Sequence, residues 1–245
     1  MSKITKALEK AARERLQRRK EQATVAATKT TLALAKLKSR KQRVVAVFVA
    51  TRLNLPTLRD TIGLAIALGA DGMMFNRFNP GGRGWQNFAR LSASGEELQA
   101  ALDLAEELSE KYQFPISCSI PMPPCVFSTA RYKKLTFGFC AAGTDRAYYT
   151  LDPLGNVRPC NHSATIIGNI RTDKFATMVK SARMKDFLAA LPEYCRDCEH
   201  ADECRGCCKA AGESCYGDPR ALDPFIAAAA PRRGGFDDGA TAMVK

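Results

Sequence analysis

The sequence lacks any apolar run near the roughly 20 residues that a membrane-spanning helix needs, because its best run, residues 44–50, is only strand-sized. The N-terminus is charged from Lys3 onward and has no apolar segment of the kind found in secretory signals. We therefore predict a cytoplasmic protein without a membrane span. The 245 residues are 46% hydrophobic and 25% charged, an ordinary globular composition that excludes collagen and disorder throughout.

Histidine is scarce, since the chain contains only His162 and His200. This leaves little room for histidine-based catalysis, and we interpret both as loop residues or as donors to metal ligands. Cysteine, in contrast, occurs ten times. In the reducing cytoplasm these thiols are not expected to form disulfides, so binding of a metal or cluster is the leading interpretation.

Acidic charge is nearly absent from one end of the chain. The first 43 residues hold 14 of the 37 lysines and arginines and three of the 25 acidic residues, whereas the rest is almost neutral. Residues 1–28 are predicted to form a basic helical arm, and residues 30–38 a further helix. The simplest interpretation is a solvated helix that docks one apolar edge; an acidic partner, an anionic membrane surface or nucleic acid are alternatives. The neutral body does not favour nucleic-acid binding.

Strand and helix patterns alternate from residue 44 onward. Residues 44–50 form a continuous apolar run, typical of a strand buried on both faces of a parallel sheet. Helices are predicted over residues 54–69 and after the capping box that begins at Ser94, with a strand at 72–75 and a third strand into which residues 113–117 lead. We therefore predict an α/β layer or barrel for residues 29–124. Three strands make at most an incomplete barrel, because a full barrel needs about 250 residues for itself.

Short elements and turns dominate the second half of the sequence. A β-hairpin is predicted over residues 146–159, and a short helix over residues 181–191. We assign residues 125–226 to a loop-rich, cysteine-rich domain and residues 227–245 to a disordered tail.

Eight of the ten cysteines fall between Cys140 and Cys215. The densest run has the spacing Cys-x2-Cys-x5-Cys-x3-Cys and begins at Cys195. Thiolates two to five residues apart can face one centre, and Gly206 supplies the backbone freedom for a tight approach. Soft thiolates select zinc, copper(I) or iron–sulfur clusters, and the spacing alone does not decide which.

A tetrahedral zinc or a four-iron cubane takes four thiolates, so the cysteines can be counted into sets. One complete set is available from Cys195, Cys198, Cys204 and Cys215. A second set has only three members, Cys140, Cys160 and Cys208. Cys125 can supply its fourth thiolate. We interpret Cys118, in an apolar strand, as a buried structural thiol, and Cys207 as a spare thiol or an alternative ligand.

The spacing Cys-x14-Gly-x4-Cys from Cys140 to Cys160, followed by the run from Cys195 to Cys215, resembles the SPASM domain of radical SAM enzymes that modify peptides or sulfatases. The resemblance implies two auxiliary [4Fe–4S] clusters, which relay electrons or bind substrate. It assigns one cluster to Cys195, Cys198, Cys204 and Cys215, and the other to Cys140, Cys160 and Cys208. Residues 29–119 in turn resemble the second half of a radical SAM partial barrel.

Radical SAM enzymes bind their catalytic cluster through CxxxCxxC, and this sequence contains no such motif and no cysteine before Cys118. Cleavage of S-adenosylmethionine then has no iron on which to occur, so this chain alone is not expected to be active. We hypothesise a SPASM-containing portion of a peptide- or protein-modifying enzyme, truncated or dependent on a radical SAM half or a homodimer. Its other partners would be a peptide substrate and a reductant such as a flavodoxin or ferredoxin. The alternative is a non-catalytic, zinc-stabilised interaction module.

Overall fold

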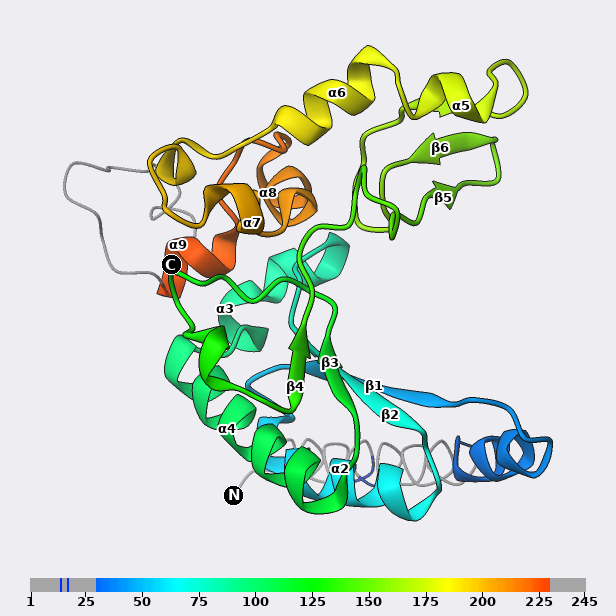
Figure 1. Cartoon of the computed structure of the whole chain (residues 1–245), viewed down its shortest axis with the longest axis vertical. Coiled ribbons are helices and arrows are strands. Elements are labelled where there is room, and N and C mark those ends of the chain that lie inside the picture. The colour runs from blue at the N-terminus through cyan, green and yellow to red at the C-terminus, as the bar shows by residue number, and fades with distance from the viewer. Residues whose placement is uncertain (1–13, 15–16, 18–29, 230–245) are drawn as a thin grey trace, which may run out of the picture.

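The structure, a computed structural model, describes Glu14, Gln17 and residues 30–229. The rest of the predicted basic arm and residues 230–245 of the predicted tail lie outside the described residues. Residues 30–39 are helical, which confirms the predicted second helix. Figure 1 shows a parallel sheet with its helices at one end of the molecule, a hairpin with short helices at the other, and α7, α8 and α9 between them.

Residues 45–137, which we call the sheet region, form a four-stranded sheet of order β1-β2-β3-β4 with every neighbouring pair parallel. Its elements are β1 (Val45–Ala50), α2 (Leu58–Ala67), β2 (Gly72–Arg77), α3 (Phe88–Leu91), α4 (Gly95–Tyr112), β3 (Ile116–Cys118) and β4 (Leu135–Phe137), with short 3₁₀ helices at Leu55–Thr57, Gly82–Asn87 and Thr129–Arg131. The predicted α/β class is confirmed.

Strand β4 was not predicted from the sequence, so the expected three-strand sheet has a fourth strand beyond residue 124. It is only three residues long, and Leu135 is its one buried side chain, which is too little for a periodic signal. The predicted capping box is confirmed: the Glu97 backbone N–H donates to Ser94 Oγ at 3.1 Å, and the Ser94 N–H donates to Glu97 Oε2 at 2.7 Å.

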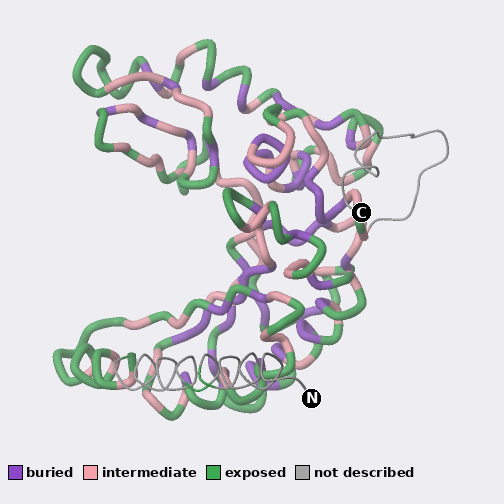
Figure 2. Tube along the Cα trace, turned by 180° about the vertical axis from the view of Figure 1, so that it is seen from behind, coloured by how far each residue is buried: buried purple, intermediate pink, exposed green. Residues whose placement is uncertain are grey.

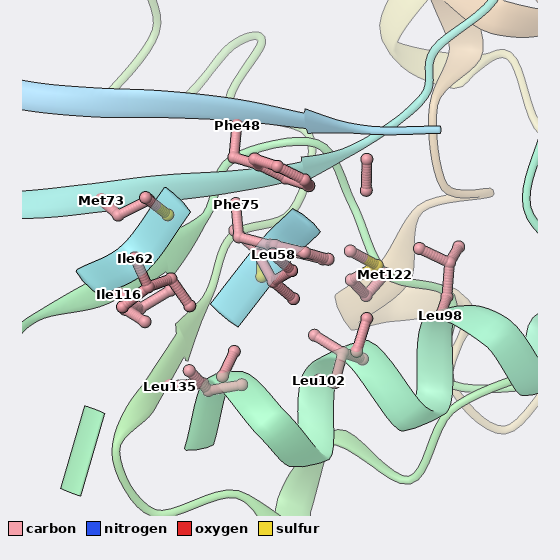
Figure 3. Close-up of a cluster of buried hydrophobic side chains, with 14 of the residues drawn as sticks. Phe48, Leu58, Ile62, Met73, Phe75, Leu98, Leu102, Ile116, Met122 and Leu135 are labelled. Atoms are coloured by element: carbon pink, nitrogen blue, oxygen red, sulfur yellow. The ribbon is translucent and has the colours of Figure 1, made fainter. Parts of the chain in front are cut away.

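One face of the sheet is covered by α2 and α4, and the main apolar core lies between them. Phe48 of β1 and Phe75 of β2 stack with ring centroids 5.9 Å apart, and they face Leu58 of α2 and Leu102 of α4 (Figure 3). Burying each such side chain contributes roughly 1.5–3 kcal/mol. This core therefore holds the sheet and its two helices together.

The opposite face of β1 is open, which corrects the prediction of burial on both faces. Val45, Val47 and Val49 are 40%, 62% and 45% exposed, whereas Phe48 and Ala50 on the other face are buried. Strand β1 is also the edge of the sheet and pairs with β2 alone among the described strands. The described residues therefore leave apolar side chains of β1 exposed on this face.

Residues 138–229, which we call the cysteine-rich region, contain short elements. These are β5 (Thr150–Leu151), β6 (Asn156–Arg158), β7 (Gly168–Asn169), α5 (Phe175–Met178), α6 (Ala182–Ala189), a 3₁₀ helix at Glu193–Cys195, α7 (Ala201–Cys204), α8 (Lys209–Tyr216) and α9 (Pro224–Ala229). Strands β5 and β6 form the predicted antiparallel hairpin, and α6 is the predicted helix. Figure 2 shows buried residues in the sheet region and around α8.

The predicted disordered tail begins too early, because residues 227–229 complete helix α9. The carboxylate of Asp223 accepts from the Phe225 N–H at 3.0 Å at the start of this helix. Phe225 then stacks on Phe127 of the sheet region, with ring centroids 5.8 Å apart. Alanine is a strong helix former, so the alanines after Ile226 extend the docked helix.

Candidate metal centre

A cavity of about 660 Å³ lies where the sheet region meets the cysteine-rich region. Strands β2, β3 and β4 are parallel, and Asn76, Ser119 and Gly138 at or just after their carboxyl ends line this cavity. The side-chain oxygen of Asn76 accepts from the backbone N–H groups of Ser119 at 2.9 Å and Ile120 at 3.1 Å, which holds the loop after β3 in place. Such an edge is where open α/β sheets bind ligands.

Three predicted ligands line this single cavity although they are far apart in the sequence: Cys140, Cys160 and Cys208. Cys140 follows β4, Cys160 follows β6, and Cys208 immediately precedes α8. Tyr148, on the cavity wall, lies close enough to interact with all three. Burial raises its pKa most, and the sulfurs of Cys160, Cys208 and Cys140 raise it further. The three thiols of the predicted first set therefore border the same cavity.

Glu213 of α8 explains how the Cys160 loop reaches Cys208. Its buried carboxylate accepts from Ser163 Oγ at 2.5 Å, from the Ala164 N–H at 3.2 Å and from Thr165 Oγ1 at 2.6 Å. Charge-assisted hydrogen bonds of this kind are about twice as strong as neutral ones. They fasten the loop after Cys160 to the helix that begins just after Cys208.

The surroundings of Cys160 suit a metal-bound sulfur. Burial raises the pKa of this thiol, while hydrogen bonds from the backbone N–H groups of His162 and Ser163 act in the opposite direction. Hydrogen bonds to ligand sulfurs are a usual feature of iron–sulfur sites and help to set their potentials. His162 lines the cavity and contributes its backbone, in keeping with its interpretation as a supporting loop residue. His200 lies beside the exposed Glu199, with 3.7 Å between Nε2 and Oε1.

The predicted second set is spread over a tight run of turns and α8. Cys195 ends a 3₁₀ helix, Cys198 donates its N–H to the Cys195 carbonyl at 3.3 Å, and Cys204 ends α7. Cys215 lies in the last turn of α8, seven residues after Cys208. Cys195 and Cys204 are buried, whereas Cys198 and Cys215 are partly exposed.

A sharp reversal of the backbone follows Cys204. Arg205, Gly206 and Cys207 have φ angles of 56°, 79° and 63°, so three consecutive residues adopt the left-handed conformation. A hydrogen bond from the Cys207 thiol and, to a smaller extent, the N–H groups of Cys207 and Gly206, which this turn directs at the Cys204 sulfur, lower the pKa of Cys204 to about 7 against the effect of burial. A Cβ at Gly206 would lie 2.7 Å from Pro192, so only glycine fits there.

The remaining cysteines have different environments. Cys118 is 1% exposed in the core of the sheet region, which confirms its interpretation as a structural thiol, and burial raises its pKa to about 12. Cys207 is completely buried, next to Cys204, and lies 3.6 Å from the Pro121 carbonyl. Cys125 packs against the cluster of Cys204, Cys207 and Ile226, and it is not among the residues that line the cavity. Its assignment to the first set stays a prediction.

A buried ion pair missed by the sequence analysis joins the two regions at this point. Arg77, at the end of β2, pairs with Asp223, and both side chains are fully buried. Arg77 Nε also donates to the Pro121 carbonyl at 2.8 Å, and its Nη2 lies 3.4 Å from Cys207 Sγ. Asp223 and the sulfurs of Cys207 and Cys208 raise the Arg77 pKa against the effect of burial. An arginine at the end of a largely buried strand was the available signal, since arginine is almost never buried without a partner.

Asn79, two residues after β2, reaches the first cysteine set. Its Nδ2 donates to Cys208 Sγ at 3.4 Å, while its buried Oδ1 has no hydrogen-bond partner among the residues that the structure describes. The sheet region thus contributes two donors to the cysteine-rich region, Arg77 at Cys207 and Asn79 at Cys208.

The donor set fits an iron–sulfur cluster in its chemistry. The candidate ligands are soft thiolates, and backbone N–H groups are directed at Cys160 and Cys204. In the part of the chain that the structure describes, no three histidine, cysteine or acidic side chains form a group that could hold one metal ion. A single zinc needs its thiolates within about 2.3 Å of one point, whereas a cluster accepts each thiolate on a different iron atom.

A family model of an iron–sulfur cluster-binding domain, SPASM, matches residues 140–199. This match includes Cys140, Cys160, Cys195 and Cys198, and it ends before Cys204. It supports iron–sulfur binding in this part of the chain, in agreement with the resemblance seen in the cysteine spacing.

Curated relatives are similar to most of the chain. A PqqA peptide cyclase of Ruegeria pomeroyi is 29% identical over 181 residues, which cover 71% of this chain and 46% of the relative. PqqA peptide cyclases of Bradyrhizobium diazoefficiens and Rhodopseudomonas palustris are each 26% identical over 184 residues, which cover 72% of this chain and 47% of the relative. The chain therefore matches less than half the length of these relatives. Among the described residues, no helix is long and apolar enough to cross a membrane.

Proposed function

We propose that this chain, a radical SAM/SPASM domain protein, is the cluster-binding portion of a peptide-modifying enzyme. One observation carries the proposal: Cys140, Cys160 and Cys208 come from three separate segments and line one cavity. We assign these three cysteines to a first auxiliary [4Fe–4S] cluster. Cys125 or a substrate atom would supply the fourth ligand.

We assign a second [4Fe–4S] cluster to the thiols of the turns and α8: Cys195, Cys198, Cys204 and Cys215. The left-handed turn after Cys204 supports this assignment, because it directs two N–H groups at a predicted ligand sulfur. Bound there, the clusters would supply one-electron transfer or a docking point for substrate. The chain's own part is to hold the sulfurs and to shape the cavity beside them.

We further propose that the sheet region is half of a radical SAM barrel, within residues 29–137, and that the cluster domain spans residues 138–226. The exposed face and the edge position of β1 among the described strands support this. Val45, Val47 and Val49 on that face are apolar side chains of the kind that another protein layer normally covers. The missing barrel strands and the CxxxCxxC site would come from protein outside these 245 residues, in the same polypeptide or in a separate chain. S-adenosylmethionine would bind to that other part.

The substrate class we propose is a peptide, as the name of the relatives states for them. The cavity suits such a substrate, since it is of the size found for ligand sites and combines apolar walls with polar groups such as Asn76 and Asp145. A small electron-transfer protein, a flavodoxin or ferredoxin, would supply the electrons.

The test is cluster loading of the full chain, purified and reconstituted without oxygen. Two four-iron clusters require roughly eight iron and eight acid-labile sulfide ions per chain, with a brown colour. Cys140→Ser should lose about half of both, whereas Cys118→Ala, a change at a core thiol outside the two sets, should keep the full content. A colourless, zinc-loaded protein without sulfide would overturn the proposal and favour the zinc-stabilised interaction module.

A further inference from the structure

Lys209, the first residue of α8, lies between the two predicted cysteine sets. It is only 3% exposed, and it lines the cavity bordered by Cys140, Cys160 and Cys208. On its other side, Nζ donates to the carbonyl of Arg205 at 2.9 Å, directly after Cys204. Lys209 therefore borders the cavity of the first predicted set, and its ammonium group is hydrogen-bonded to the residue that follows Cys204 of the second.

This buried cation has no carboxylate to balance it. Its hydrogen-bond acceptors are two backbone carbonyls, those of Ala190 and Arg205, and it forms no salt bridge within the described residues. Arg77 shows the contrast, since it is equally buried but is paired with Asp223. Burying an ammonium group without a counter-charge is strongly unfavourable in free energy. An anion bound nearby would offset this unfavourable term.

The groups that can act as that anion are the cysteine sulfurs. Burial lowers the pKa of Lys209, and the neighbouring Arg205 guanidinium also lowers it, whereas the sulfurs of Cys140, Cys195 and Cys204 raise it. Cys140 belongs to the predicted first set, and Cys195 and Cys204 belong to the predicted second set. One side chain thus interacts with thiols of both sets.

We infer that Lys209 is the charge-compensating residue shared by the two clusters, holding each at a higher reduction potential than it would have without the cation. This inference rests on the proposed cluster binding. A four-iron cluster with thiolate ligands is anionic, and reduction adds a further negative charge. A fixed cation beside it favours the reduced form, the more so in a buried site of low dielectric constant.

The experiment compares the reconstituted full chain with the variants Lys209→Met and Lys209→Arg in redox titrations followed by electron paramagnetic resonance. Lys209→Met removes the charge and keeps a long apolar stem, and its clusters should titrate at more negative potentials at both centres. Lys209→Arg keeps the charge and should stay close to the wild-type potentials. Lys185→Met, a change at an exposed lysine of α6, serves as the matched control and should shift neither potential.

Full iron and sulfide content in Lys209→Met, with both potentials unchanged, would overturn the inference. If Lys209→Met loads no clusters, the Arg variant decides: normal loading of Lys209→Arg supports a need for charge, and failure of both variants shows that the shape of the lysine side chain matters instead. A wild-type chain without iron and sulfide would contradict the proposed function itself, which separates that outcome from a failure of the Lys209 inference.

Discussion

The sheet region and the cysteine-rich region are of similar length but are held together in different ways. In the sheet region, 20 buried apolar side chains and Phe225 of α9 form one continuous cluster. The cysteine-rich region has two separate clusters of six and three residues, and the smaller one consists of Cys204, Cys207 and Ile226. An apolar core of that size is too small to hold a domain by itself.

Buried polar groups take a correspondingly larger part in the cysteine-rich region. Glu213, Lys209 and Asp223 are all buried there, and each is bound to backbone or side-chain groups from other segments, Asp223 to Arg77 of β2. Small domains without a large core commonly depend on disulfides or metals. All ten cysteines are free thiols, so the proposed clusters would supply the stability that the small apolar clusters of this half do not.

The largest effect is expected from Cys204→Ala, which should unfold the cysteine-rich region and leave the sheet region folded. Metal sites can contribute on the order of 10 kcal/mol to small domains that depend on them. Hydrogen exchange followed by mass spectrometry, with iron content measured on the same samples, would report the two regions separately.

The matched change in the sheet region is Leu102→Ala, in the main apolar core. It should cost about 2–5 kcal/mol and increase exchange in α4 and the strands, while iron per folded chain stays constant. Stable Cys204→Ala protein with unchanged iron content would contradict the metal dependence of the cysteine-rich region.

An intermediate effect is expected from Arg77→Met, which tests the joint between the two regions. Removing one partner of a fully buried ion pair leaves Asp223 uncompensated and should cost about 3–5 kcal/mol in urea unfolding. Arg77→Met combined with Asp223→Leu should recover part of that loss, because apolar replacement of both partners removes the unpaired charge. If the double variant is less stable than Arg77→Met alone, the pair acts through its other contacts, at Cys207 and Pro121.

The two regions also differ in what their sequences reveal. The sheet region was predictable from local patterns: the apolar run of β1, the Ser94 capping box and the helical periodicity of α4 all correspond to observed elements. Strand β4 was not predicted, because three residues with one buried side chain carry no periodic signal. The open face of β1 could not be predicted, since an apolar strand looks the same whether or not its cover is present.

For the candidate site, spacing predicted which cysteines to consider but not the side chains that support them. That Cys140, Cys160 and Cys208 line one cavity follows from loops whose paths depend on Glu213 and on the sheet edge. Lys209 and Asp223 are of residue types that are rarely buried, so the sequence favours exposure, and only tertiary packing buries them. Long-range placement of this kind has no local signal.

The smallest effect on stability is expected from Val47→Lys on the open face of β1, and it gives the sharpest test of what covers that face. Because Val47 is 62% exposed, the change should alter the free energy of unfolding of this chain by less than about 0.5 kcal/mol. Its neighbour Phe48 points into the core, so Phe48→Ala is the matched control and should cost about 3–5 kcal/mol in the same urea titration. A protein that supplies the remaining barrel strands should bind the wild-type chain and lose affinity for Val47→Lys, measured by calorimetry. If Val47→Lys destabilised this chain as much as Phe48→Ala does, the face would be covered by residues of the chain itself, and no outside barrel half would be needed to explain its composition.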